Sequence, residues 1–407
     1  MQHEQNAGSA QEAPQGLQEE LVALRRDLHR EPETGLHLPR TQAKVLAALD
    51  GLGLEISTGE RLSSVTAVLR GGACDGQGPV VLLRGDMDAL PVQEESGEPY
   101  ASEVPGAMHA CGHDLHTAGL VGAAKLLAAR RAELAGDVVF MFQPGEEEGG
   151  GARLMIEEGV LDAAGRRADA AYGLHVAANT LPLGLAATRP GALLAASDTL
   201  RVTVNGQGGH GSSPHAAQDP VPAACAMVTA LQTMVTREFD AYEPVVISVG
   251  LLRAGTAANV IPDTAHFEAT VRTLSEERRS AVREAASRTV RGIAEAHGLS
   301  CEVAYEEGYP VTANDPSEAA YALEVAREVF GARRVLEAPR PMSGAEDFSF
   351  VLREVPGAYL FLGATPPGAD PVTAPFNHSP RAVFDDAVLG DGALLLAELA
   401  ASRLRHR

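Results

Sequence analysis

The sequence has little positive charge and almost no lysine. Lys and Arg together number 33, against 54 Asp and Glu, which gives a formal net charge of -21 over 407 residues. The only lysines are Lys44 and Lys125, both within Ala- and Leu-rich stretches of helical pattern. Nucleic-acid binding needs clustered basic residues, and Schiff-base and P-loop chemistry need a lysine. The composition argues against all three.

Tryptophan and long apolar runs are also absent. No stretch approaches the roughly 18 apolar residues of a transmembrane helix, and the first residues lack the apolar segment of a signal peptide. The four cysteines, Cys74, Cys111, Cys225 and Cys301, form no C-x-x-C pair, which favours a reducing compartment over a disulfide framework. We therefore expect a cytoplasmic protein that binds neither membrane nor nucleic acid, with residues 1–16 disordered.

The length and the apolar content predict a globular protein of two or three domains. Helical patterns alternate with short apolar strands, which predicts a largely parallel sheet covered by helices on both faces. The expected helices span 17–30, 41–53 and about 114–131, and the expected strands span 79–85, 137–143, 170–176 and 357–363.

Between these segments the pattern changes. Strand, helix, two strands, helix and strand follow one another over 198–206, 220–239, 245–252, 264–274, 275–296 and 301–307. This is the β-α-β-β-α-β order of a ferredoxin-like unit. We expect a domain of residues 186–305 inserted into a larger α/β domain formed by residues 17–185 and 306–407.

Residues able to bind or react gather where the strands of the larger domain end, which is where open α/β sheets bind ligands. In "RGDMDALP", Asp86 and Asp88 follow a buried strand, although capping of a turn is an equally good interpretation. In "MHACGHDLH", Cys111 and His113 lie two residues apart and can converge on one ion. Thiolate and imidazole suit Zn²⁺ and similar divalent metals, and a bound cation would deprotonate the thiol.

In the same segment, His109 and His116 flank the Cys-x-His pair, and Asp114 is well placed to cap the following helix. Three further segments extend this set of donors. In "FQPGEEEGGGA" a buried strand runs into adjacent glutamates, which would repel one another unless a cation lay there, although such triplets are usually solvated loops. One glutamate can bind a metal while its neighbour serves as a base. His175 of "GLHV" and His378 of "FNHSP" would complete a site for two ions.

The motifs "RGDMDALP", "MHACGHDLH", "FQPGEEEGGGA", "GLHV", "GGHGSSPH", "ANVIPD", "SGAEDFS" and "NHSP", in this order, resemble the M20 family of metallopeptidases. More narrowly, they resemble its amidohydrolase branch, which includes hippurate hydrolases and auxin-conjugate hydrolases. The matching motifs extend over nearly the whole chain from Leu17. Gly145 stands where the family commonly has Ala, and Glu148 extends the usual glutamate pair to a triplet.

The resemblance implies a zinc-peptidase-like catalytic domain, an inserted dimerisation or lid domain, and two divalent ions per subunit, which could be Mn, Zn, Ni or Co. Glu146 would be the general base. Asp86 and Asp88 would support the metal ligands without binding the ions themselves. The metal ligands would be Cys111, His113, Glu147, His175 and His378. The spacing from "FQP" and "GGA" favours this register over one shifted by a residue.

For the inserted domain, the resemblance implies that His210 reaches an active site, usually that of the other subunit of a homodimer, to stabilise the oxyanion. Asn259 and Arg272 would hold the substrate's carboxylate or acyl carbonyl. The alternatives are a solvated histidine in a glycine-rich turn and an arginine held in an ion pair. Glu346 and Asp347 of "SGAEDFS" could cap a helix or contact the site.

The function implied is a metal-dependent amidohydrolase that cleaves aroyl, indolyl-acyl or acetyl amino acids into a carboxylic acid and a free amino acid. A dipeptidase, an N-carbamoyl amino acid hydrolase or a biosynthetic deacetylase would use the same residues. A metal-containing binding protein without turnover is the alternative from another class, and Glu146 argues against it because a pure binder needs no base.

Overall fold

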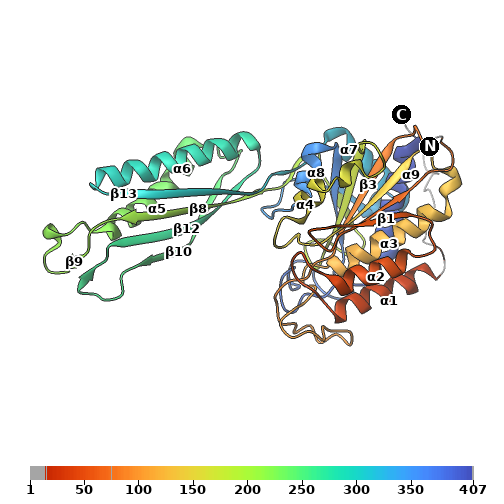
Figure 1. The fold of residues 1–407 in the computed structure, drawn as a ribbon, viewed down its shortest axis with the longest axis horizontal. Coiled ribbons are helices and arrows are strands. Elements are labelled where there is room, and N and C mark those ends of the chain that lie inside the picture. The colour runs from red at the N-terminus through yellow and green to blue at the C-terminus, as the bar shows by residue number, and fades with distance from the viewer. Residues whose placement is uncertain (1–13, 15, 75, 406–407) are drawn as a thin grey trace, which may run out of the picture. The chain divides into compact units, whose positions relative to one another are not determined.

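The computed structural model describes residues 14, 16–74 and 76–405, so the expected disorder of residues 1–16 falls almost wholly outside the described residues. The chain divides into two compact units, shown in Figure 1. The larger comprises Met1–Gly191, Ala313–Pro339 and Phe350–Arg407, and the smaller comprises Ala192–Thr312 and Arg340–Ser349. The segment "SGAEDFS", which we expected in the larger domain, thus groups with the smaller unit.

The larger unit contains an eight-stranded sheet of order β1-β2-β4-β3-β5-β16-β6-β15. In its middle, β3 is parallel to β4 and β5, and β16 is parallel to β5, whereas β2 and β6 run antiparallel to their neighbours β4 and β16. The mostly parallel sheet is confirmed. The strand bounds are β1 (Glu55–Thr58), β2 (Val65–Leu69), β3 (Val80–Asp86), β4 (Asp137–Gln143), β5 (Ala170–Ala177), β6 (Ala186–Thr188), β15 (Val335–Glu337) and β16 (Gly357–Gly363).

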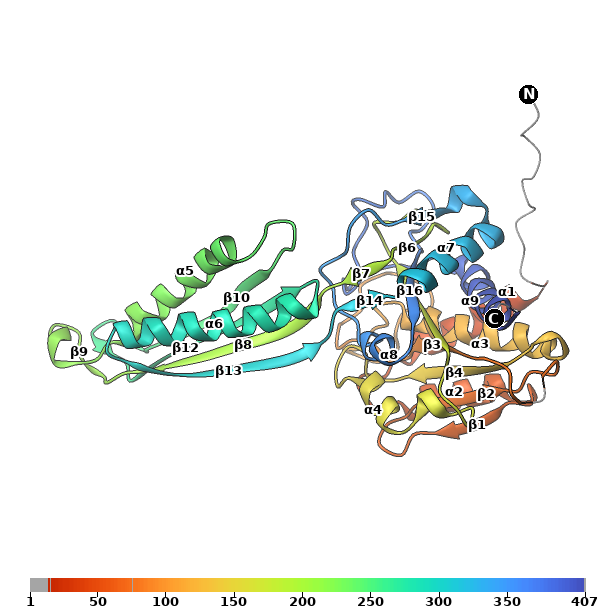
Figure 2. The ribbon, with the colours of Figure 1, turned by 90° about the horizontal axis from the view of Figure 1, so that it is seen from above.

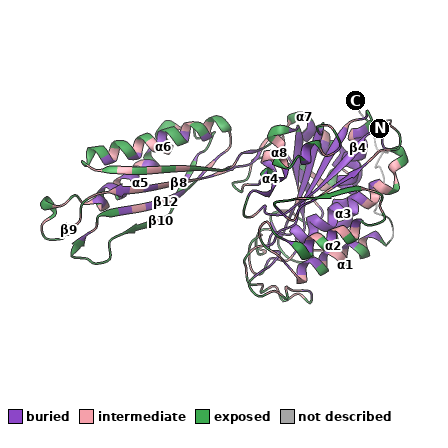
Figure 3. Ribbon diagram, viewed as in Figure 1, coloured by how far each residue is buried: buried purple, intermediate pink, exposed green. Residues whose placement is uncertain are grey.

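Helices flank this sheet, and its central strands are buried along nearly their whole length (Figure 3). Helix α3 lies directly on β3 because Gly85 has no side chain: a Cβ there would stand 2.9 Å from the carbonyl oxygen of His116. The helices are α1 (Leu17–Arg30), α2 (Pro39–Leu49), α3 (His113–Ala129), α4 (Gly151–Glu157), α7 (Pro316–Phe330), α8 (Ser349–Glu354) and α9 (Val388–Arg405).

The smaller unit has the predicted ferredoxin-like order, with an antiparallel sheet β10-β12-β8-β13. Residues of β8 and β12 alternate between buried and more exposed positions, and their buried side chains pack with those of α5 and α6 on one face (Figure 2). Its elements are β8 (Ala196–Asn205), β9 (Gly209–His210), α5 (Pro220–Glu238), β10 (Val246–Ala254), β11 (Val260–Ile261), β12 (Thr264–Thr273), α6 (Glu276–Ala296) and β13 (Ser300–Tyr309). Two short strands, β7 (Gly191–Leu194) and β14 (Thr312–Asn314), lie where the chain passes between units.

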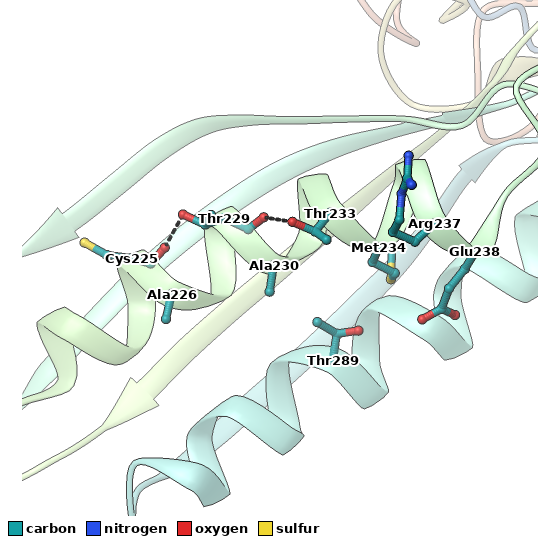
Figure 4. A pocket seen from close by; sticks show the side chains of 9 residues that line it. All are labelled: Cys225, Ala226, Thr229, Ala230, Thr233, Met234, Arg237, Glu238 and Thr289. Atoms are coloured by element: carbon teal, nitrogen blue, oxygen red, sulfur yellow. Dashed lines mark hydrogen bonds between the residues drawn. The ribbon is translucent and has the colours of Figure 1, made fainter.

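A surface groove of about 720 Å³ lies between α5 and α6 of the smaller unit (Figure 4). Small side chains such as Cys225, Ala226 and Thr229 line it, and Thr289 closes it from α6. Arg237 and Glu238 are its only charged lining residues. It contains none of the predicted site residues.

Candidate active site

The predicted metal-binding side chains meet at the carboxyl ends of the parallel strands in the larger unit. Asp86 ends β3, the glutamates follow β4, and His175 lies near the end of β5. His378 lies in the loop after β16, and Cys111 immediately precedes α3. Because parallel strands point the same way, residues far apart in sequence reach one edge of the sheet.

Two groups of possible ligands share the thiol of Cys111. One contains His113 and His175, the other Glu147 and His378, and in each the ligand atoms lie within 4.8 Å of one another. The Cys111 Sγ is 3.4 Å from His175 Nε2 and 3.3 Å from His378 Nε2, which is 3.2 Å from Glu147 Oε1. A single thiolate between two sets of donors suits a pair of adjacent cations.

Two imidazoles of this cluster, those of His175 and His113, differ in their hydrogen bonds. His175 Nδ1 donates to the Val176 carbonyl at 2.8 Å. The proton of the neutral ring is therefore on Nδ1, and the lone pair of Nε2 faces Cys111. His113 is fully buried, yet its ring nitrogens have no hydrogen bond within the described residues and lie 3.5–3.8 Å from carboxylate oxygens of Asp86, Asp88 and Glu147. Buried polar atoms of native proteins are almost always satisfied. A cation would satisfy these, so the donor set fits a metal centre.

The protonation equilibria of the metal-free cluster agree with this interpretation. Burial raises the pKa of the Cys111 thiol and lowers the pKa of His175, because it disfavours the charged forms. Hydrogen bonds with Cys111 and Glu147 raise the pKa of His378 to about 10. The cluster therefore retains protons that a divalent cation would displace.

The glutamate loop is held by Asp88 and shaped by glycine. Both carboxylate oxygens of Asp88 accept backbone N–H bonds, from Glu146 and Glu147, at 3.0 Å each. Gly145 has φ 72°, and a Cβ on Gly151 would stand 1.7 Å from the carbonyl oxygen of Pro144. This tight return keeps Glu146 buried in one group with His113 and Glu147, whereas Glu148 is exposed.

Two residues outside the predicted ligand set also support the cluster, and the first of them, Asn377, was given no role from the sequence. Asn377 donates to the carbonyl oxygens of Cys111 and Val176 and accepts from the Ala178 N–H, which fastens the loop of His378 onto β5. That histidine has φ 72°, a left-handed conformation that needs such support. Adjacency to the histidine in "FNHSP" was the only signal for Asn377 in the sequence.

The other residue is Asp114, for which capping of α3 was expected. The structure corrects this: Gly112 is the N-cap, and Asp114 is buried within the first turn. Its Oδ2 lies 2.7 Å from both Arg25 Nε and His29 Nδ1. The carboxylate therefore ties the start of α3 to α1.

In the smaller unit, His210 and Asn259 lie together on the β9–β11 ribbon. His210 pairs with Val260, and the Gly211 N–H donates to the Asn259 carbonyl at 2.9 Å. The Ser212 N–H donates to His210 Nδ1 at 3.1 Å, so the proton of the neutral ring resides on Nε2. The exposed imidazole thus presents a donor.

Arg272 lies at the opposite end of β12 from this ribbon. Within the described residues it has no ion pair, and burial lowers its pKa although Asp198 opposes the shift. Its strand neighbours are Ser197 and Val246, so no acid is paired with it across the sheet. Arg272 is eight positions along β12 from Thr264, the first residue of the strand, or roughly 27 Å.

The remaining acidic pair is buried just before α8. Glu346 Oε1 accepts a hydrogen bond from the Phe348 N–H at 3.0 Å, as a capping residue would. Asp347 is fully buried.

Taken together, the mostly parallel sheet and the shared-thiol cluster define an α/β protein with donors for two metal ions at one edge of its sheet. The model of peptidase family M20/M25/M40 matches residues 82–402, and the chain belongs to this family. It is 37% identical over 381 residues to an N-acetylcysteine deacetylase of Bacillus subtilis, covering 93% of this chain and 96% of the relative. It is 36% identical over 392 residues to a hippurate hydrolase of Campylobacter jejuni, covering 96% and 98%.

The fold agrees with solved structures. The Bacillus subtilis YXEP protein, described as a dinuclear metal binding peptidase from the M20 family, superposes with a TM-score of 0.84 at 34% identity, covering 97% of this chain and all of that one. The protein is therefore a metal-dependent hydrolase that acts on amides. Within the described residues, no helix is both long and apolar enough to cross a bilayer.

Proposed function

We propose that this protein hydrolyses the amide bond of N-acyl amino acids in the cytoplasm, releasing a carboxylic acid and a free amino acid. The observation that carries the proposal is a second buried glutamate, Glu146, beside the cluster of Cys111, His113, Glu147, His175 and His378. A site that only bound metal would need no such base. The four free thiols agree with a reducing compartment.

Each residue has a defined task in this reaction. Bound divalent ions would supply a Lewis acid for the amide carbonyl and lower the pKa of the attacking water. Glu146 takes the proton of that water and then delivers it to the leaving nitrogen. The Nε2–H of His210 donates to the carbonyl oxygen as negative charge develops there.

Arg272 suits the carboxylate of the amino acid, because its planar guanidinium can bind both oxygens and has no ion pair among the described residues. An N-acyl amino acid is only about two residues, or about 7 Å, long. The roughly 27 Å of β12 that separates Arg272 from the end next to His210 exceeds this length. If both contact one substrate, they come from two copies of the chain, as in a homodimer.

A substrate panel with metal-stripped protein tests the proposal. We expect no release of amino acid until Mn²⁺, Zn²⁺, Ni²⁺ or Co²⁺ is added, and then cleavage of one class among N-benzoyl, indole-acetyl and N-acetyl amino acids. Cleavage confined to dipeptides or N-carbamoyl amino acids would instead support the corresponding member of the family. No release of amino acid from any substrate with any metal would contradict the proposal that the protein is an N-acyl amino acid hydrolase.

Arg272→Ala should raise KM about 10- to 100-fold for substrates with a free carboxylate, since a charged hydrogen-bonded pair contributes about 1.5–3 kcal/mol, and should change KM little for the corresponding amides. Arg272→Lys should fall between, because a point charge cannot form the bidentate pair. Steady-state kinetics on each acid and its amide measure the difference. Equal effects on both would remove Arg272 from carboxylate recognition.

A further inference from the structure

His116 lies among the candidate metal ligands, three residues after His113 on α3. Its ring centroid is 5.3 Å from that of His113 and 4.7 Å from that of His175. Together with Asp86 and His113 it forms a fully buried trio whose donor atoms could surround an ion. Proximity alone would therefore make His116 a further metal ligand.

The hydrogen bonds of the ring indicate otherwise. The Val176 N–H donates to His116 Nε2 at 2.8 Å, which occupies the electron pair of that nitrogen. The proton of the neutral ring is consequently on Nδ1, which donates to Asp86 Oδ1 at 2.5 Å. A metal bond to either nitrogen would break one of these two buried hydrogen bonds.

We propose that His116 is a positioning residue that clamps the end of β3 to the main chain of β5 and thereby sets the spacing between His113 and His175. This inference rests on the proposed function, in which both neighbours hold metal. His113 stands nearly one helical turn before His116, so the two rings share a face of α3. His175 precedes Val176 on β5, so the same hydrogen bond fixes the backbone beside it.

Other buried contacts lock the carboxylate end of this clamp. The Arg84 guanidinium pairs with Asp86 and donates from Nε to Gln143 Oε1 on β4 at 2.9 Å. Thr117 Oγ1 donates to the Asp86 carbonyl at 2.8 Å. Four elements, β4, β3, α3 and β5, are thus joined through the Arg84 guanidinium, the Asp86 carboxylate and the His116 imidazole. Such supporting partners orient ligands and influence metal affinity.

The test compares His116→Gln with Leu127→Ala. Glutamine can keep only one of the two hydrogen bonds. Leu127, buried about three turns further along α3, lies outside this network and provides a control for lost stability. Ions per chain at saturating Co²⁺, the Co²⁺ absorption spectrum, kcat and KM are measured for both variants and for the wild type.

We expect His116→Gln to retain both ions at saturation, bind them about 10- to 100-fold more weakly, alter the Co²⁺ spectrum, and lower kcat with little change in KM. Leu127→Ala should lower Tm but keep the spectrum and kcat. Loss of one ion per chain at saturating Co²⁺ would mean that His116 is a ligand. An unchanged spectrum and kcat would mean that His116 only fills space in the core. Either result overturns the inference. A wild type that binds no ions would instead refute the proposed function.

Wild-type protein gives an independent readout if the glutamine variant does not fold. With ¹¹³Cd²⁺ and ¹⁵N-labelled histidine, the nitrogens of His113 and His175 should couple to cadmium. His116 should show no coupling and should keep its proton on Nδ1. Cadmium coupling to His116 would overturn the inference.

Discussion

Glu146→Gln protein is expected to bind metal as the wild type does and to lose about 10²- to 10⁴-fold in kcat, the usual contribution of a general base. The amide preserves the size of the side chain but cannot accept a proton from water. Glu147→Gln should lose metal as well, because Oε1 of Glu147 lies 3.2 Å from His378 Nε2, in one group of possible ligands with Cys111. Metal content and turnover of the purified variants separate the two roles.

Glu148→Gln is the matched control, since it makes the same change in the same loop on an exposed side chain. It should leave both metal content and kcat close to wild-type values. Equal loss of metal in Glu146→Gln and Glu147→Gln would refute the division of roles. Retained metal in Glu147→Gln, with loss in the Glu148 variant, would mean that the register of the glutamates lies one residue later.

The sequence was informative about the site because the chemistry follows the ends of parallel strands. Asp86, the glutamates and His175 each come directly after or within an apolar run that could only be a buried strand, so their convergence follows from the sheet. The ferredoxin-like order was predictable for a similar reason, since the alternation of β8 and β12 and the long patterns of α5 and α6 are local signals.

What the sequence could not reveal depends on contacts between distant segments and backbone atoms. His116 and Asn377 act through the main chain of β5 and of the Cys111 loop, and no pattern of side chains records a hydrogen bond to a backbone group. Asp114 had the sequence position of a helix cap, but its carboxylate forms ion pairs with Arg25 and His29 of α1. Burial disfavours a lone carboxylate, and the positive charges of Arg25 and His29 offset that cost for Asp114.

Mixing two inactive variants should restore activity if the substrate is held by residues of two subunits. His210→Ala removes the donor to the developing oxyanion, and Glu146→Gln removes the base, so each homodimer should be nearly inactive. A hybrid dimer contains one site in which both groups are intact. Random exchange makes half of the dimers hybrid, so about a quarter of wild-type activity is expected from equal amounts.

This recovery has a geometric basis within the smaller unit. The hydrogen bond from Ser212 leaves Nε2–H of His210 as an exposed donor, and the length of β12 separates it from Arg272 of the same chain. Separately tagged subunits, followed by native mass spectrometry and an activity assay during exchange, provide the measurement, with each variant mixed with itself as the control. Complete exchange without recovery would mean that His210 serves the site of its own chain, or none, and Arg272 would then have to bind something other than the same substrate.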